Sequence, residues 1–139
     1  MTKYIKLILC LLLVGSVLAG CVGDFEPVAE PFVKEMMEAL ASGDTDTATA
    51  LMHPTTVEQL EDVESGFQAM MDLVAGNQVV EMKRRSINIS NYMGTNAAKK
   101  ETGSFRMVMD DGAVMVAEYS YVENAAGAGF ESFHLSVGT

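Results

Sequence analysis

The stretch Ser104–Val122, SFRMVMDDGAVMVAEYSYV, carries the strongest structural signal in this chain. Apolar and polar residues alternate on both sides of Asp110–Gly112, and such alternation is typical of strands with one buried face. The Asp-Gly pair favours a tight hairpin turn, because glycine readily adopts the positive φ angles that the turn requires. The stretch therefore predicts an antiparallel hairpin.

The segments around this hairpin extend the sheet and add helices before it. Residues 91–101 are polar and predict a loop, whereas the residues before position 78 place their apolar side chains at helical spacing. Gly66 is expected to bend or divide the last helix. The predicted helices cover residues 27–42, 47–52 and 57–74, and the predicted strands cover residues 79–90, 102–109, 113–123 and 129–137.

Helices followed by an antiparallel sheet define the α+β class. We expect two to three N-terminal helices packed on one curved antiparallel sheet of about four strands. Lys and Arg number 9 against 19 Asp and Glu, a net charge of −10, and this acidity argues against nucleic acid as a partner. The chain has 2 cysteines and no cluster of Cys and His, so neither a disulfide framework, a metal nor a cofactor is predicted.

The amino terminus predicts the location of the protein. Lys3 and Lys6 precede a short apolar run that ends in the tetrapeptide Leu18–Cys21, LAGC. This tetrapeptide resembles the lipobox of bacterial lipoproteins. The resemblance implies removal of residues 1–20, lipidation of Cys21 by diacylglycerol and by a fatty acid such as palmitate, and a tether over residues 21–26.

Processing of this kind would leave 119 residues with a net charge of −12. The lipid bilayer is then the first expected partner, because two or three buried acyl chains give stable anchoring. The resemblance places the protein in the bacterial cell envelope. Val22 follows the cysteine where aspartate often signals the inner membrane, so the outer membrane is favoured if the organism has one.

A second resemblance concerns the domain over residues 27–139. The segment Ala39–Asp44, ALASGD, is followed by Ala48, by Leu51-Met52 and by His53-Pro54. It is similar to the opening of the nuclear-transport-factor-two-like superfamily, which has a cone-shaped, cystatin-like α+β fold. This fold hosts enzymes, binding modules and assembly domains, so the resemblance implies a fold and leaves the function open.

Strand parity predicts what lines the cone. Tyr119 and Tyr121 share the face of the third strand that also carries Met115, whereas Arg106 and His134 fall on the opposite face of the sheet. No inward acid–base pair follows from this parity, and no catalytic residue is assigned. The side chains predicted to line a ligand pocket, or to fill the same space as core, are those of Phe32, Met36, His53, Phe105, Met107, Tyr119, Tyr121 and Phe133.

Three functions are compatible with this pattern. The leading hypothesis is a non-enzymatic domain that binds a small apolar or amphipathic ligand or an envelope protein. A homodimer through the outer sheet face, with Val114, Val116 and Val122, is the second hypothesis. The third is an enzyme resembling isomerases or dehydratases that uses Tyr119, His53 or Glu131.

Overall fold

The computed structural model describes residues 26–92 and 97–138. The predicted leader and the lipidation site Cys21 lie outside the described residues. Among the described residues, none of the helices has both the length and the apolar character needed to cross a membrane.

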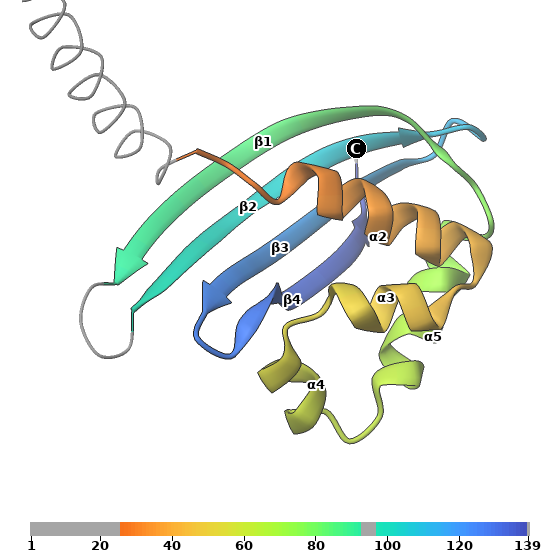
Figure 1. Cartoon of the computed structure of the whole chain (residues 1–139). Helices are drawn as coiled ribbons and strands as arrows, with labels where there is room; N and C mark the ends of the chain where they lie inside the picture. Colours follow the sequence, from red (N-terminus) through yellow and green to blue (C-terminus); the bar gives the residue numbers. More distant parts are fainter. Residues whose placement is uncertain (1–25, 93–96, 139) are drawn as a thin grey trace, which may run out of the picture.

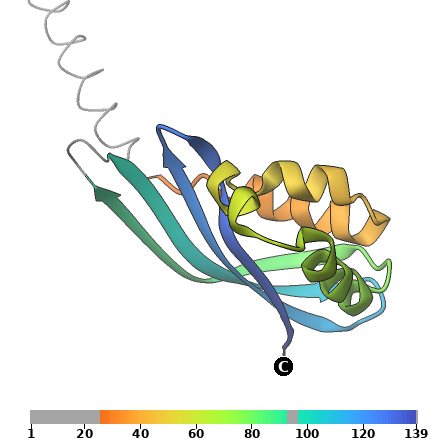
Figure 2. The same ribbon diagram turned by 90° about the horizontal axis from the view of Figure 1, so that it is seen from below.

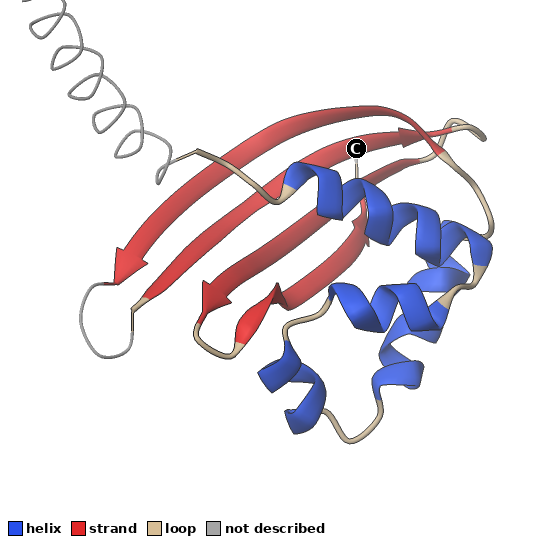
Figure 3. Ribbon diagram, viewed as in Figure 1, coloured by secondary structure: helices blue, strands red, loops and turns tan. Residues whose placement is uncertain are grey.

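A single antiparallel sheet with strand order β1-β2-β3-β4 forms the framework. Its curvature and the placement of the helices against it are visible in Figures 1 and 3. Figure 2 shows that the helices cover one face of the sheet and leave the ends of the strands near the β1–β2 connection uncovered. The predicted α+β class is therefore confirmed. The strands are Val79–Tyr92 (β1), Ala98–Met109 (β2), Val114–Asn124 (β3) and Gly127–Val137 (β4), and the helices are Glu30–Ser42 (α2), Thr45–Leu51 (α3), Pro54–Gln59 (α4) and Val63–Val74 (α5).

The helical region differs from the prediction at one break. Residues 57–74 do not form one helix divided at Gly66, because the chain leaves the helix after Gln59 and begins α5 at Val63. The carboxylate of Asp62 accepts the backbone N–H of Ser65 at 3.0 Å and starts a new helix, and Gly66 lies inside that helix.

The first helix begins at Glu30 rather than at residue 27, and Gly43 ends it with a φ of 72°. Glycine adopts such a left-handed C-cap without the steric cost that a side chain would add. Asp44 then caps α3 by accepting the N–H of Thr47 at 3.1 Å, so this helix begins at Thr45 rather than at residue 47.

The core lies between the helices and the concave face of the sheet. Met36, Phe105, Met107 and Phe130 are each at most 1% exposed and represent α2, β2 and β4 in this core. On the outer face of the sheet, Val116 is 7% exposed, and Val114 and Val122 are half-buried. The aromatic rings that meet in the core are those of Phe32, Phe105, Tyr119, Tyr121, Phe130 and Phe133.

Candidate functional site

Glu101 is a carboxylate buried inside the cone, and only 1% of the residue is exposed. Its Oε1 accepts the backbone N–H groups of Val28 at 2.6 Å and of Ala29 at 3.3 Å. Its Oε2 accepts the hydroxyl of Tyr119 at 2.5 Å. Negative charge at this place is favourable, because the carboxylate lies at the N-terminal end of α2, where the helix dipole is positive.

Tyr119 connects this carboxylate to a cation on β1. Nη1 of Arg84 donates to the phenolic oxygen at 2.8 Å, and the guanidinium lies 4.4 Å from the centre of the Phe105 ring. Burial, followed by the hydrogen bond to Glu101, raises the pKa of Tyr119 to about 12, although Arg84 acts in the opposite direction. The phenol therefore stays protonated at neutral pH and donates to the carboxylate.

Sequence reasoning missed Glu101 and Arg84. The prediction began the second strand at residue 102, whereas β2 begins at Ala98 and includes Glu101. Alternate residues of a strand share a face, and Glu101, Gly103 and Phe105 are alternate residues. A predicted strand that began before residue 101 would therefore have placed Glu101 on the concave face with Phe105. The contact with the start of α2 spans more than 70 residues of sequence and has no local signal.

The chain Arg84–Tyr119–Glu101 joins three strands to the start of α2. In the described residues every buried side-chain nitrogen and oxygen has a hydrogen-bond partner, so these groups are already engaged with one another. Their arrangement positions α2 on the sheet. It does not present an open carboxylate to a ligand.

The predicted pocket residues are packed together in the same region. The Phe32 and Tyr121 rings are stacked with centroids 5.1 Å apart, and Tyr119 lies 5.8 Å from Phe105. None of the five pockets described on this structure is lined by more than one of the eight predicted residues. In the structure Met36, His53, Phe105, Met107, Tyr119, Tyr121 and Phe133 are buried, and Phe32 is half-buried.

His53 is buried at 3% exposure and caps α4. Its Nδ1 accepts the N–H of Thr55 at 3.2 Å, and its Nε2 lies 3.0 Å from Oδ1 of Asn124. The same Oδ1 accepts the N–H of Ala126 at 3.1 Å, which identifies it as an acceptor. The ring proton of His53 therefore belongs on Nε2, and both ring nitrogens are occupied.

A pocket of about 350 Å³ lies beside His53, between α4 and the outer side of the sheet. Glu131 also lines it and pairs with Nζ of Lys100 at 3.1 Å. Two of the three residues proposed for an enzyme, His53 and Glu131, therefore line this pocket. The third, Tyr119, does not line it. The lining residues are His53, Thr55, Thr56, Gln59, Tyr92, Ala98, Lys100, Val122, Asn124 and Glu131.

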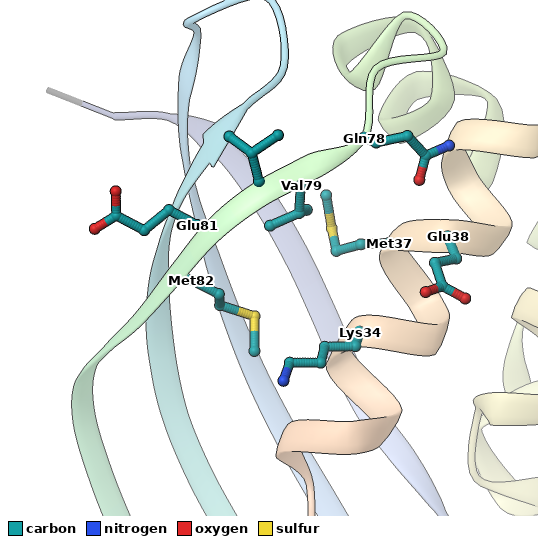
Figure 4. A pocket seen from close by; sticks show the side chains of 8 residues that line it. Lys34, Met37, Glu38, Gln78, Val79, Glu81 and Met82 are labelled. Atoms are coloured by element: carbon teal, nitrogen blue, oxygen red, sulfur yellow. The ribbon is translucent and has the colours of Figure 1, made fainter.

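A second pocket, of about 270 Å³, lies between α2 and the beginning of β1 (Figure 4). Gln78 and the first four residues of β1, 79–82, line it, and the register of β1 with β2 shifts between Val79 and Glu81. Because these consecutive residues do not all share one face, the pocket runs along the outer edge of β1. From α2 come residues Lys34, Met37 and Glu38, whose spacing places them on one side of the helix.

Within this pocket, called the α2–β1 cleft below, apolar and charged side chains are separated. Figure 4 shows Val79 and Met82 directed toward α2, where Met37 faces them, and Glu81 directed away. Met37 is 2% exposed, and Val79 and Met82 pack on the core, so they form an apolar floor. The described residues contain no group of three or more His, Cys, Asp or Glu side chains arranged to hold a metal ion.

No protein-family profile matches the sequence, and no curated protein is detectably similar to it. Among solved structures, a protein of the NTF2-like family from Streptomyces avermitilis, named provisionally as a dehydratase, matches with a TM-score of 0.38 and 16% identity. The match covers 75% of this chain and 89% of that chain. A likeness of this size carries no conclusion about activity. The α+β class rests on the strands and helices described above, and the superfamily resemblance stays a prediction.

Proposed function

We propose that this chain is a lipid-anchored protein of the bacterial cell envelope whose domain binds an amphipathic ligand in the α2–β1 cleft. The observation that carries the proposal is the cleft itself, an open concavity with an apolar floor and a charged rim at the edge of the sheet. Sites of this kind combine apolar lining with a few polar groups that orient the ligand. The interior of the cone is occupied by packed side chains, so a ligand would bind at the surface.

The chemistry of the rim favours a cation. The carboxylates of Glu38 and Glu81 and the ammonium of Lys34 line the cleft. Glu81 points away from α2 and pairs with Lys83 at 3.4 Å, so the preference for a cation rests on Glu38 and on the net charge of −10 of the whole chain. An acidic protein attracts cationic molecules over long distances. A volume of about 270 Å³ suits one short apolar chain or side chain attached to an amine. Met37 and Met82 add adaptable thioether side chains that accommodate apolar groups of different shapes.

The test uses octylammonium as a probe and the chain that begins at Glu26, which contains all the described helices and strands. With ¹³C-labelled methionine methyl groups, octylammonium should shift the signals of Met37 and Met82 and leave those of Met70 and Met115 unchanged. Octanoate, which carries the same alkyl chain on an anion, should bind more weakly. Equal binding of the two probes would contradict the proposed charge preference, and unchanged Met37 and Met82 signals would contradict the site.

A matched pair of variants distinguishes binding in the cleft from non-specific binding elsewhere on the surface. Met82→Gln keeps the length of the side chain and makes the floor polar, so the dissociation constant for octylammonium should rise about fivefold, equivalent to about 1 kcal/mol. Met70→Gln changes a half-buried methionine that lines a different pocket, on α5. This control should bind octylammonium like the native chain.

Anchoring is tested separately on the protein expressed with its full leader. Mass spectrometry of the mature amino terminus should find Cys21 carrying diacylglycerol and a further acyl chain. An unmodified Cys21 would overturn the anchoring and leave the cleft proposal standing. Fractionation of the membranes of a diderm host tests the preference for the outer membrane that Val22 indicates.

A second candidate function is acid–base chemistry in the pocket beside α4. It is favoured by one observation, that His53 and Glu131 line the same pocket of about 350 Å³. Against it stand the partners that both groups already have, because a general base must have a lone pair within reach of its substrate. The accessibility of the His53 ring decides between these alternatives, and the experiment is given in the Discussion.

A further inference from the structure

The outer edge of β1 differs from the opposite edge of the sheet. At β4, the segment after α3 lies alongside the strand, with a bridge between Met52 and Phe130 and a hydrogen bond of 2.8 Å from the His53 N–H to the Phe130 carbonyl. Among the described residues, β1 pairs with β2 alone. An edge of this kind exposes backbone donors and acceptors that can pair with another strand.

The two halves of β1 differ in the features that hinder pairing with another strand. The first half carries Glu81 and the basic run Lys83–Arg85, and its register with β2 is interrupted at Val79/Glu81 and at Arg84/Ser86. Charges and bulges are the devices that prevent edge-to-edge pairing. From Ser86 to Tyr92 the register with β2 is continuous and no residue is charged. The second half therefore lacks the protection that the first half has.

The unprotected half contains a palindrome, Ser86-Ile87-Asn88-Ile89-Ser90. A second copy paired antiparallel about a two-fold axis at Asn88 would place Ile87 opposite Ile89 and Ser86 opposite Ser90. Directly opposite residues share a face of the sheet, so each isoleucine would meet an isoleucine and each serine a serine. The nearest charged residue, Arg85, would fall opposite the neutral Asn91 of the second copy.

The two isoleucines are only partly covered in the single chain, since Ile89 is half-buried and Ile87 is exposed. Ile87 and Ile89 pair with Gly103 and Glu101, which places them on the concave side. Ile87 is nevertheless 40% exposed. Of the five exposed large apolar residues in the described chain, three lie on β1, namely Val80, Ile87 and Tyr92. Pairing would remove Ile87 from water.

We propose that residues 86–90 of β1 pair with the same residues of a second copy, which joins two four-stranded sheets into one continuous sheet of eight strands. The α2–β1 cleft lies at the other half of the strand, so this proposal goes beyond the ligand site and does not depend on it. Five residue pairs form a small interface, and we expect the dimer to be favoured where chains are concentrated, as on a membrane surface.

Cysteine cross-linking in whole cells that express the full chain reads the register directly. Asn88→Cys should form a disulfide dimer on oxidation with diamide, because the two copies of this position face each other on the axis. Ser86→Cys alone should form little, since its two copies would lie about 13 Å apart along the strands. Co-expression of Ser86→Cys with Ser90→Cys should restore the dimer. The native chain measures the background from Cys10 and Cys21.

A charge on the edge should abolish the pairing. Ile89→Lys, added to Asn88→Cys, should lower the dimer yield about tenfold or more, because lysine opposes edge-to-edge pairing. Val137→Lys is the matched control, since it places the same charge at a 73% exposed valine of β4, and the yield should not change. Resistance to proteolysis confirms that each variant is folded.

Two outcomes would overturn the proposal. One is an Asn88→Cys dimer yield no higher than that of the native chain. The other is a Ser86→Cys yield equal to that of the Ser86→Cys and Ser90→Cys mixture, which requires a different register. Anchoring is read independently from the mass of Cys21, so failure of the dimer and failure of the anchor are distinguishable.

Discussion

The hydroxyl of Tyr119 donates a hydrogen bond of 2.5 Å to Oε2 of Glu101, a carboxylate that is only 1% exposed. The other oxygen of this carboxylate accepts the N–H of Val28 at 2.6 Å, immediately before α2. One acidic side chain thus holds the third strand and the first helix at once. Removing it would leave several buried groups without partners, and each such group costs free energy.

Glu101→Ala is therefore expected to lower the free energy of unfolding by about 3 kcal/mol or more, as measured by urea denaturation. Glu131→Ala is the matched control. It removes a carboxylate that is half-exposed and paired with Lys100, and such pairs contribute less than about 1 kcal/mol. Equal losses in the two variants would show that the buried carboxylate does not hold α2.

Gly103→Ala should destabilise the fold, because the added Cβ would lie 2.6 Å from the carbonyl oxygen of Ser86 and 2.9 Å from the hydroxyl of Tyr119. The expected loss is about 1–3 kcal/mol in thermal or urea denaturation. Gly66→Ala provides the contrast. Its Cβ meets nothing within 4 Å, and alanine favours the helix interior by about 1 kcal/mol, so this variant should be more stable than the native chain. A neutral Gly103→Ala would contradict the close packing of Tyr119 over β2.

Alkaline pH should reveal the buried phenol. The pKa of Tyr119 is raised to about 12 in the folded state from an unfolded value of 10.0, so the folded chain keeps this proton while the unfolded chain loses it. Stability should therefore be unaffected below pH 10 and should fall as pH rises toward 12, by on the order of 2 kcal/mol from this group. The steeper fall in the native chain relative to Tyr119→Phe isolates this contribution from the other titrating groups.

Absorbance at 295 nm follows the same ionisation spectroscopically. Burial also raises the pKa of Tyr121, so both core phenols should titrate late. Tyr119→Phe should remove the phase at the highest pH. A phase near pH 12 that survives in Tyr119→Phe would mean that another phenol is responsible.

Diethylpyrocarbonate distinguishes the two histidines. Acylation needs an accessible ring nitrogen with a free lone pair, whereas His53 is 3% exposed and its Nδ1 accepts the N–H of Thr55. His134 is exposed on β4 and should react first. Peptide mass spectrometry should find His134 modified and His53 protected in the folded chain. Modification of His53 at a comparable rate would favour acid–base chemistry in the pocket it shares with Glu131.

The hairpin and the core face were predictable because they depend on neighbours in sequence. The turn at Asp110–Gly112 and the alternation around it placed Phe105, Met107, Tyr119 and Tyr121 on the concave face. The break between α4 and α5 was not predictable in the same way. Gly66 is the stronger breaker by propensity, but the Asp62 cap starts α5 at Val63 and leaves Gly66 inside the helix.

Sequence periodicity by itself determined the α+β order and the apolar parity of the strands, because both follow from local spacing. Only the tertiary structure decided that the residues predicted to line a pocket form a packed core. Whether the space between α2 and the sheet is open or filled depends on how the side chains of these elements meet. The same holds for the Arg84–Tyr119–Glu101 chain and for the α2–β1 cleft. Each is made by residues far apart in the chain, whose contacts arise only when the sheet curves around the helix.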